Sequence, residues 1–83
     1  MAARVQYSHP QRGINKTVPM LRPPINVGDV EAWFKAARKT IPEIPRNWYR
    51  PPPVMDLKYI MFELIDHATH ERCAVIIERK TGG

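Results

Sequence analysis

Residues 59–78, YIMFELIDHATHERCAVIIE, fit either a β-hairpin or the continuation of a helix that begins near Val54. We expect the hairpin, with 59–65 and 73–78 as its strands, because aromatic and β-branched residues dominate both segments. The run 74–77 is strand-like whatever precedes it, and a single strand needs a partner. The helical alternative would give two helices followed by a short strand.

The loop of this hairpin, 66–71, has the composition of a turn. Asp66 and Thr69 can form hydrogen bonds with nearby backbone groups, as turn residues do. His70 is then expected in the left-handed backbone region that glycine usually occupies.

Both faces of the expected hairpin are apolar. One face carries Ile60, Phe62 and Leu64, and the other carries Tyr59, Met61 and Ile65. A single helix can cover only one face of a sheet. The second face is therefore expected to meet the N-terminal segment or another protein.

An amphipathic helix is expected at 29–40. Asn26 or Asp29 can cap its N-terminus, and Pro42 ends it at about Thr40. Apolar residues recur along one helical face, namely Val30, Trp33, Phe34, Ala37 and Ile41.

The segment 41–53 is a connector with five prolines, which exclude a regular helix or a central strand. It carries Trp48 and Tyr49 between Arg46 and Arg50. We expect it to be stiff and partly extended.

Residues 1–28 contain no Asp or Glu, and they hold +4 of the chain's net charge of +5. No helical or strand periodicity is evident among their scattered apolar residues and prolines. The segment is therefore interpreted as an extended basic arm that lies on its own body or on a partner, and simple disorder is the alternative.

The expected architecture is α+β. The arm at 1–28 precedes a small body at 29–83, which consists of the helix 29–40, the connector 41–53 and a hairpin within 57–80.

Eighty-three residues allow one domain with a small core. Cys73 is the only cysteine, which excludes an internal disulfide and favours a reducing, intracellular compartment. An organelle-targeting role for the acid-free start is an alternative, although its prolines oppose the amphipathic helix of such signals. The apolar run 54–65 is too short and too charged to span a bilayer.

Catalytic and metal-binding patterns are weak. His67, His70 and Cys73 are zinc-compatible, but structural zinc needs four close ligands and only this triplet is present. A pair of Cys73 with a histidine lacks an oxyanion hole and a substrate pocket. We therefore expect no enzyme, no cofactor, no metal site and no small-molecule substrate.

Basic residues interleaved with aromatic residues are the stronger pattern, because phosphates attract cations and exposed rings stack on unpaired bases. The candidate residues for binding an anionic partner are Arg4, Arg12, Lys16, Arg22, Lys35, Arg38, Lys39, Arg46, Trp48, Tyr49 and Arg50.

The leading functional hypothesis is a non-catalytic accessory subunit. It would dock on a larger assembly, or form an oligomer, through its basic arm and its apolar sheet face. The alternative is a small protein that binds RNA or single-stranded DNA. An anionic membrane surface could use the same charges.

Overall fold

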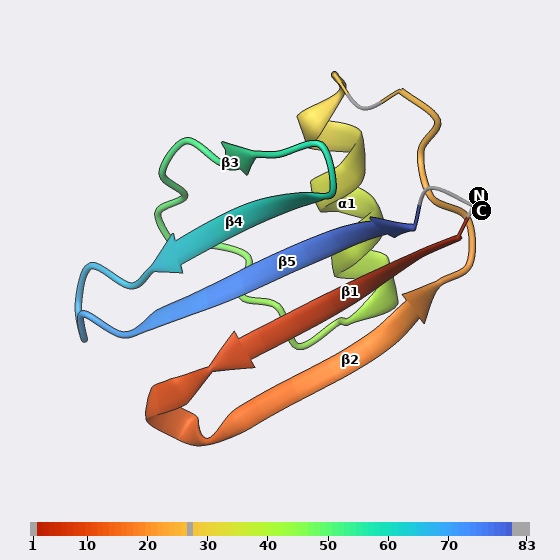
Figure 1. Cartoon of the computed structure of the whole chain (residues 1–83). Coiled ribbons are helices and arrows are strands. Elements are labelled where there is room, and N and C mark those ends of the chain that lie inside the picture. Colours follow the sequence, from red (N-terminus) through yellow and green to blue (C-terminus); the bar gives the residue numbers. More distant parts are fainter. Residues whose placement is uncertain (1, 27, 81–83) are drawn as a thin grey trace.

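The computed structural model describes residues 2–26 and 28–80, which form a five-stranded antiparallel sheet with one α-helix on one of its faces (Figure 1). The strands lie in the order β2-β1-β5-β4-β3. The element bounds are Ala2–His9 (β1), Ile14–Met20 (β2), Val30–Thr40 (α1), Val54–Met55 (β3), Tyr59–Ile65 (β4) and Arg72–Lys80 (β5). Because the chain is mainly β, the expected α+β layout of arm, helix, connector and hairpin is wrong. The alternative with two helices is wrong as well.

The segment interpreted as an arm forms β1 and β2. β1 pairs with β2 on one side and with β5 on the other, so that Val5 lies opposite both Val18 and Ile77. Its side chains alternate between the core and the opposite face, and Val5 and Tyr7 are fully buried. The strand periodicity of this segment was therefore missed, and its residues supply part of the core.

The prolines of this segment occupy positions that a sheet tolerates. Pro10 opens a 3₁₀ turn, Pro10–Arg12, and Gly13 closes it with a left-handed φ of 67°. Pro19 lies in β2, which is an edge strand, and a missing backbone N–H is tolerated at an edge.

The prediction for α1 is confirmed. Asp29 caps the helix by accepting a hydrogen bond from the backbone N–H of Ala32 at 3.1 Å. The predicted apolar stripe faces the sheet, where the rings of Phe34 and Phe62 lie 4.9 Å apart. The helix ends at Thr40, two residues before Pro42.

The pairing of β4 with β5 confirms the predicted hairpin. Phe62 lies opposite Val75, and both side chains are buried. In the turn, Asp66 accepts a hydrogen bond from the N–H of Ala68 at 3.0 Å, and His70 has a φ of 60°. The left-handed position expected for His70 is thus confirmed.

The connector between α1 and β3 is anchored to the core and to the sheet. Ile41 and Ile44 are buried. Further along, Tyr49 and Ile65 exchange two backbone hydrogen bonds of 2.8 Å, which form an isolated bridge to β4.

The sheet has one covered and one open face. α1 and the connector lie behind the sheet in Figure 1, and none of the segments that the structure describes crosses the front face. The second face is expected to meet the N-terminal segment or another protein; the N-terminal segment does not cover it, because this segment widens the sheet instead. Among the described residues, no helix has the length and apolar character needed to cross a membrane.

Candidate anion-binding pocket

A pocket of about 260 Å³ lies between α1 and the connector, on the covered side of the sheet. Its lining includes four cations and two aromatic rings, namely Lys35, Arg38, Arg46, Arg50, Phe34 and Trp48. The only acidic side chain in the lining is Glu31, so the lining has a net charge of +3.

Helical spacing places one half of the pocket. Glu31, Phe34, Lys35 and Arg38 follow one another at intervals of three, one and three residues, which puts all four on one face of α1. Phe34 packs on Phe62 of β4 and forms the apolar floor of this face.

The connector places the other half. The backbone bridge between Tyr49 and Ile65 holds this part of the connector in an extended conformation against β4. Successive side chains of an extended segment point in opposite directions. Trp48 and Arg50 therefore line the pocket, whereas Tyr49 lies outside it against the ring of His67, with 5.6 Å between ring centroids.

Two guanidinium groups lie over the same aromatic ring. The Cζ atoms of Arg38 and Arg50 are 4.8 Å and 4.5 Å from the centroid of Phe34. Arg38 also donates a hydrogen bond to the carbonyl of Arg46 at 2.8 Å, and Arg50 donates one to Glu31. These contacts hold both planar groups in place before any ligand binds.

The pocket retains donors for a ligand. The Nε of Arg38 is buried and has no hydrogen-bond partner among the residues that the structure describes. A guanidinium carries five N–H donors, so the hydrogen bond from Arg38 to the carbonyl of Arg46 leaves other donors of this group for an oxyanion. Arginine forks also suit the geometry of phosphate and carboxylate groups.

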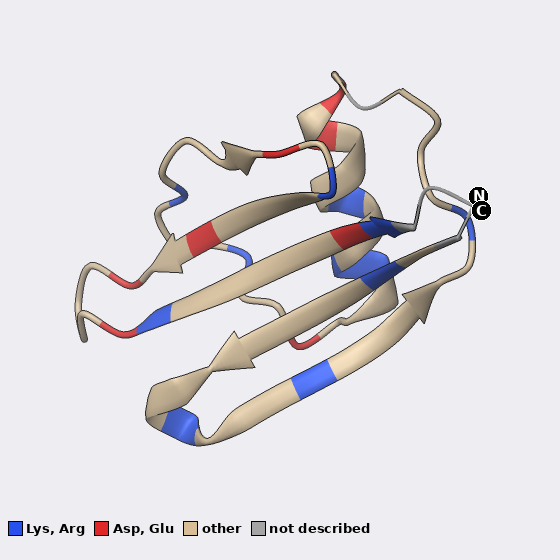
Figure 2. Ribbon diagram, viewed as in Figure 1, with Lys and Arg blue, Asp and Glu red and all other residues tan. Residues whose placement is uncertain are grey.

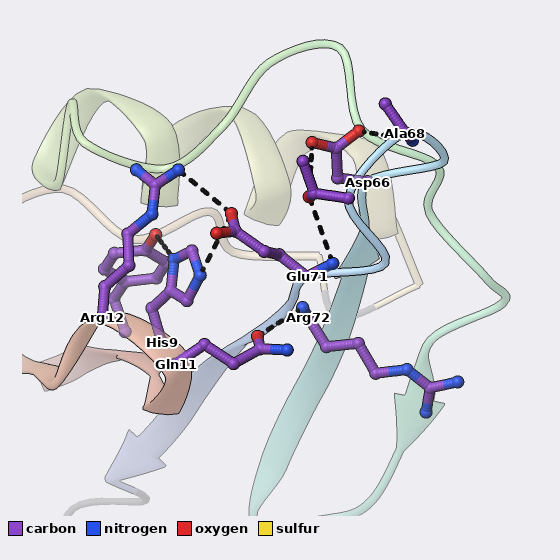
Figure 3. Close-up of polar contacts among 9 residues, drawn as sticks. His9, Gln11, Arg12, Asp66, Ala68, Glu71 and Arg72 are labelled. Atoms are coloured by element: carbon purple, nitrogen blue, oxygen red, sulfur yellow. Dashed lines mark hydrogen bonds and ion pairs between the residues drawn. The ribbon is translucent and has the colours of Figure 1, made fainter.

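A buried histidine supports Trp48 from the core side. The ring of His9, which is 1% exposed, meets Trp48 edge-on with 5.5 Å between centroids. Its Nδ1 lies 3.3 Å from the hydroxyl of Tyr7, and its Nε2 lies 3.7 Å from the carboxylate of Glu71 (Figure 3). Arg12 donates to the same carboxylate at 3.0 Å.

Burial keeps the side chains of Cys73 and Tyr7 protonated at neutral pH. It raises the pKa of the Cys73 thiol to about 11 and, together with the nearby Cys73, raises the pKa of Tyr7 to about 12. At neutral pH Cys73 is therefore a protonated thiol, which is a poor nucleophile and a poor metal ligand. Within residues 2–26 and 28–80, no group of three or more His, Cys, Asp and Glu side chains is placed to hold a metal ion.

The protein was compared with protein-family models, with curated proteins and with solved structures. None of the three comparisons found a match. The function must therefore be inferred from the chemistry of the site.

The predicted binding residues are partly brought together. Five of them line the pocket: Lys35, Arg38, Arg46, Trp48 and Arg50. Arg22 and Lys39 line a second hollow, of about 530 Å³, between the end of β2 and α1.

The remaining cations of the N-terminal segment lie elsewhere and are neutralised. They form ion pairs with acidic residues of the later chain: Arg4 with Glu78 at 2.7 Å, Arg12 with Glu71 at 3.0 Å and Lys16 with Glu43 at 2.6 Å. The hydrogen bond from Lys16 lowers the pKa of Glu43. Most of the positive charge of the N-terminal segment is thus compensated by ion pairs within the molecule.

Sequence reasoning did not select Glu31, Phe34 or His9 as site residues. The helical spacing that links Glu31 and Phe34 to Lys35 could have identified the first two. His9 carries no such signal, because its contacts with Trp48 and Glu71 join residues that are far apart in the chain.

Proposed function

We infer that this protein is a non-catalytic binding subunit whose ligand is a single-stranded nucleic acid, held in the anion-binding pocket and along α1. The observation that carries this inference is the pocket itself, in which four cations surround Trp48 and Phe34. Cations attract phosphates, and an aromatic ring that lines a groove can stack on an unpaired base.

The cations continue beyond the pocket, which favours a polymer over a single small anion. Lys35 and Lys39 are one turn apart on α1, and Lys39 shares the second hollow with Arg22. Figure 2 shows basic residues along the helix and acidic residues only at its N-terminal end. The resulting basic track consists of Arg46, Arg50, Arg38, Lys35, Lys39 and Arg22.

The basic track can follow the backbone of one strand. Four residues of helix rise about 6 Å, so the side chains of Lys35 and Lys39 can contact different phosphates of the same strand. Stacking on Trp48 also requires a base that is not paired.

The test is fluorescence anisotropy with a labelled single-stranded oligonucleotide of about twelve nucleotides. Affinity should fall with salt with a log–log slope of roughly −3 to −4, since a single strand contributes about −0.7 per phosphate contact and the track offers five cations besides Arg50, which is paired with Glu31. Binding that is absent, or that does not change with salt, would remove the proposal.

A matched pair of variants locates the interaction. Arg46→Gln should weaken binding severalfold and make the slope shallower by about 0.7. Arg4→Gln removes the same charge from the open face of the sheet, and it should change neither the affinity nor the salt slope. Circular dichroism and thermal unfolding establish that both variants are folded.

A protein partner is the second candidate, in line with an accessory subunit of a larger assembly. Leu21 and Ile25 favour it, because their side chains are 92% and 89% exposed on the loop that follows β2. In affinity purification, Leu21→Ser with Ile25→Ser should then lose a co-purifying protein that Arg46→Gln retains. If the co-purifying protein is instead lost only from Arg46→Gln, or is released from the wild type by nuclease, the interaction is assigned to nucleic acid.

A further inference from the structure

The open face of the sheet carries a self-complementary row of side chains on β5. Cys73, Val75 and Ile77 are buried beneath α1. Side chains alternate along a strand, so the intervening residues face outward. In chain order these are Arg72, Ala74, Ile76 and Glu78, which are a cation, a small residue, a large apolar residue and an anion.

The same row read backwards is its own complement in charge and in size. When a second β5 lies antiparallel over the first, Arg72 of each copy faces Glu78 of the other, and Ile76 faces Ala74. We propose that two copies of this chain associate through their open faces about a twofold axis that passes between Ala74 and Ile76. Such an interface is isologous and closes with two copies.

A hollow on this face fits the proposed contact. It has a volume of about 320 Å³ and is lined by Met61, Glu63, Arg72 and Ala74 among others. Ile76 of the second copy would enter it over Ala74, because the proposed axis places these two side chains against each other. Alternation of large and small residues across two packed layers is what allows them to interdigitate.

The neighbouring strand adds an apolar contact under the same axis. Tyr59 pairs in register with Glu78, and Ile65 pairs with Arg72. Tyr59 of one copy therefore faces Ile65 of the other. Two sheets packed in this aligned manner keep their strand directions within about 30° of each other at a separation of about 10 Å.

The charged residues at the two ends of the β5 row define the relative orientation of the two copies. Within one copy, Glu78 pairs with Arg4 at 2.7 Å, and Arg72 approaches Glu63 at 3.5 Å. All four side chains are exposed by two fifths or more, so they remain accessible to a second copy. A parallel stacking would place like charges opposite each other, which disfavours that orientation.

This association leaves the anion-binding pocket free, because the pocket lies on the other side of the sheet. A dimer would present two pockets on its outer surfaces. The dimer and the proposed nucleic-acid binding can therefore succeed or fail independently.

The experiment is sedimentation equilibrium of the full chain from about 5 to about 500 µM, a range suited to an interface of small to standard size. The wild-type protein should reach twice the chain mass within this range. A monomer mass at every concentration would overturn the proposal, whether the face then takes another protein or stays in contact with water.

Charge reversal provides a test with an internal control. Glu78→Arg places Arg opposite Arg72, and Arg72→Glu places Glu opposite Glu78, so each variant alone should raise the dimer Kd at least about tenfold. Mixing the two variants restores both opposite-charge contacts and should give a heterodimer. A mixture that stays monomeric, or single variants that dimerise like the wild type, would overturn the proposed register.

The intrachain ion pair is controlled separately. Arg4→Gln removes the partner of Glu78 within the same copy but leaves Glu78 to face Arg72 of the second copy. This variant should dimerise with a Kd within about threefold of the wild type, because an exposed ion pair contributes little free energy. A loss of the dimer as large as that caused by Glu78→Arg would show that the assigned contact is wrong.

Discussion

The guanidinium of Arg50 lies over the ring of Phe34, with its Cζ 4.5 Å from the ring centroid. Arg38 lies over the same ring at 4.8 Å, and both groups line the candidate anion-binding pocket. The pocket therefore combines charge with fixed planar geometry. Lysine would supply the charge without the geometry, which separates two contributions to binding.

We expect Arg50→Lys to weaken binding of a single-stranded oligonucleotide about three- to fivefold, because lysine lacks the planar guanidinium fork that the ring of Phe34 holds in place for a phosphate. The salt slope should not change, because the number of cations is unchanged. Fluorescence anisotropy over a salt series measures both quantities. Arg46→Lys is the control, since no stacking contact of Arg46 is recorded in the described structure, and its affinity should stay within twofold of the wild type. Equal effects of the two substitutions would show that stacking does not contribute.

The N-terminal segment shows how far the sequence alone could predict this fold. Ala3, Val5 and Tyr7 alternate with polar residues, and this is the pattern of a half-buried strand. The prolines that follow these residues favour an irregular arm, but Pro10 opens a turn and Pro19 lies in an edge strand. What the sequence could not show is that β1 pairs with β5, because that pairing joins the two ends of the described chain.

Only part of the candidate site could likewise be predicted from the sequence. Phe34, Lys35 and Arg38 share a helix face, which local spacing predicts. Trp48 and Arg50 reach the same pocket because Tyr49 pairs with Ile65, and local patterns cannot identify such a partner. Local periodicity thus defined one half of the pocket, and a long-range backbone contact defined the other half.

The incorporation of β1 into the core predicts a clear stability difference between a residue of β1 and a residue of the loop that follows β2. Val5→Ala should destabilise the protein by about 2 kcal/mol, because Val5 is fully buried in the hydrophobic core. Leu21→Ala should change the free energy of unfolding by less than about 0.5 kcal/mol, since its side chain is exposed. Urea denaturation of both variants measures this difference. Similar values would mean that the segment does not contribute to the folded core.

The turn between β4 and β5 predicts a loss of stability in acid. Asp66 accepts hydrogen bonds from the N–H of Ala68 and the hydroxyl of Thr69, and these lower the pKa of its carboxyl, the first contact having the larger effect. A lowered folded-state pKa gives stability that is complete above the unfolded value and is lost as pH falls through the folded value.

Asp66→Ala should therefore lower the thermal midpoint at pH 7, and the difference from wild type should shrink below pH 4. Asp66→Asn is the matched control, because its amide oxygen still accepts a hydrogen bond, and it should lose less than the alanine variant. Thermal unfolding between pH 2.5 and pH 7 measures both. A difference between Asp66→Ala and wild type that is independent of pH would contradict the role of the ionised carboxylate.

The raised pKa values of the buried groups Tyr7 and Cys73 predict a loss of stability at alkaline pH. Burial raises the pKa of Tyr7 from 10.0 to about 12 and that of Cys73 from 9.0 to about 11. Because both folded-state values are raised, the stabilisation is complete below the unfolded values and is lost as pH rises through the folded ones. The free energy of unfolding should therefore fall between about pH 9 and about pH 12.

The Tyr7→Phe variant separates the contribution of Tyr7 to this alkaline loss of stability from that of Cys73. At pH 7 it should cost about 1 kcal/mol, because the hydroxyl that contacts Nδ1 of His9 is removed. Above pH 10 the variant should lose stability less steeply than the wild type, since only Cys73 still titrates. Urea midpoints measured at intervals from pH 7 to pH 11.5 give both quantities. Parallel curves for Tyr7→Phe and the wild type would show that Tyr7 ionises in the folded protein as readily as in the unfolded chain.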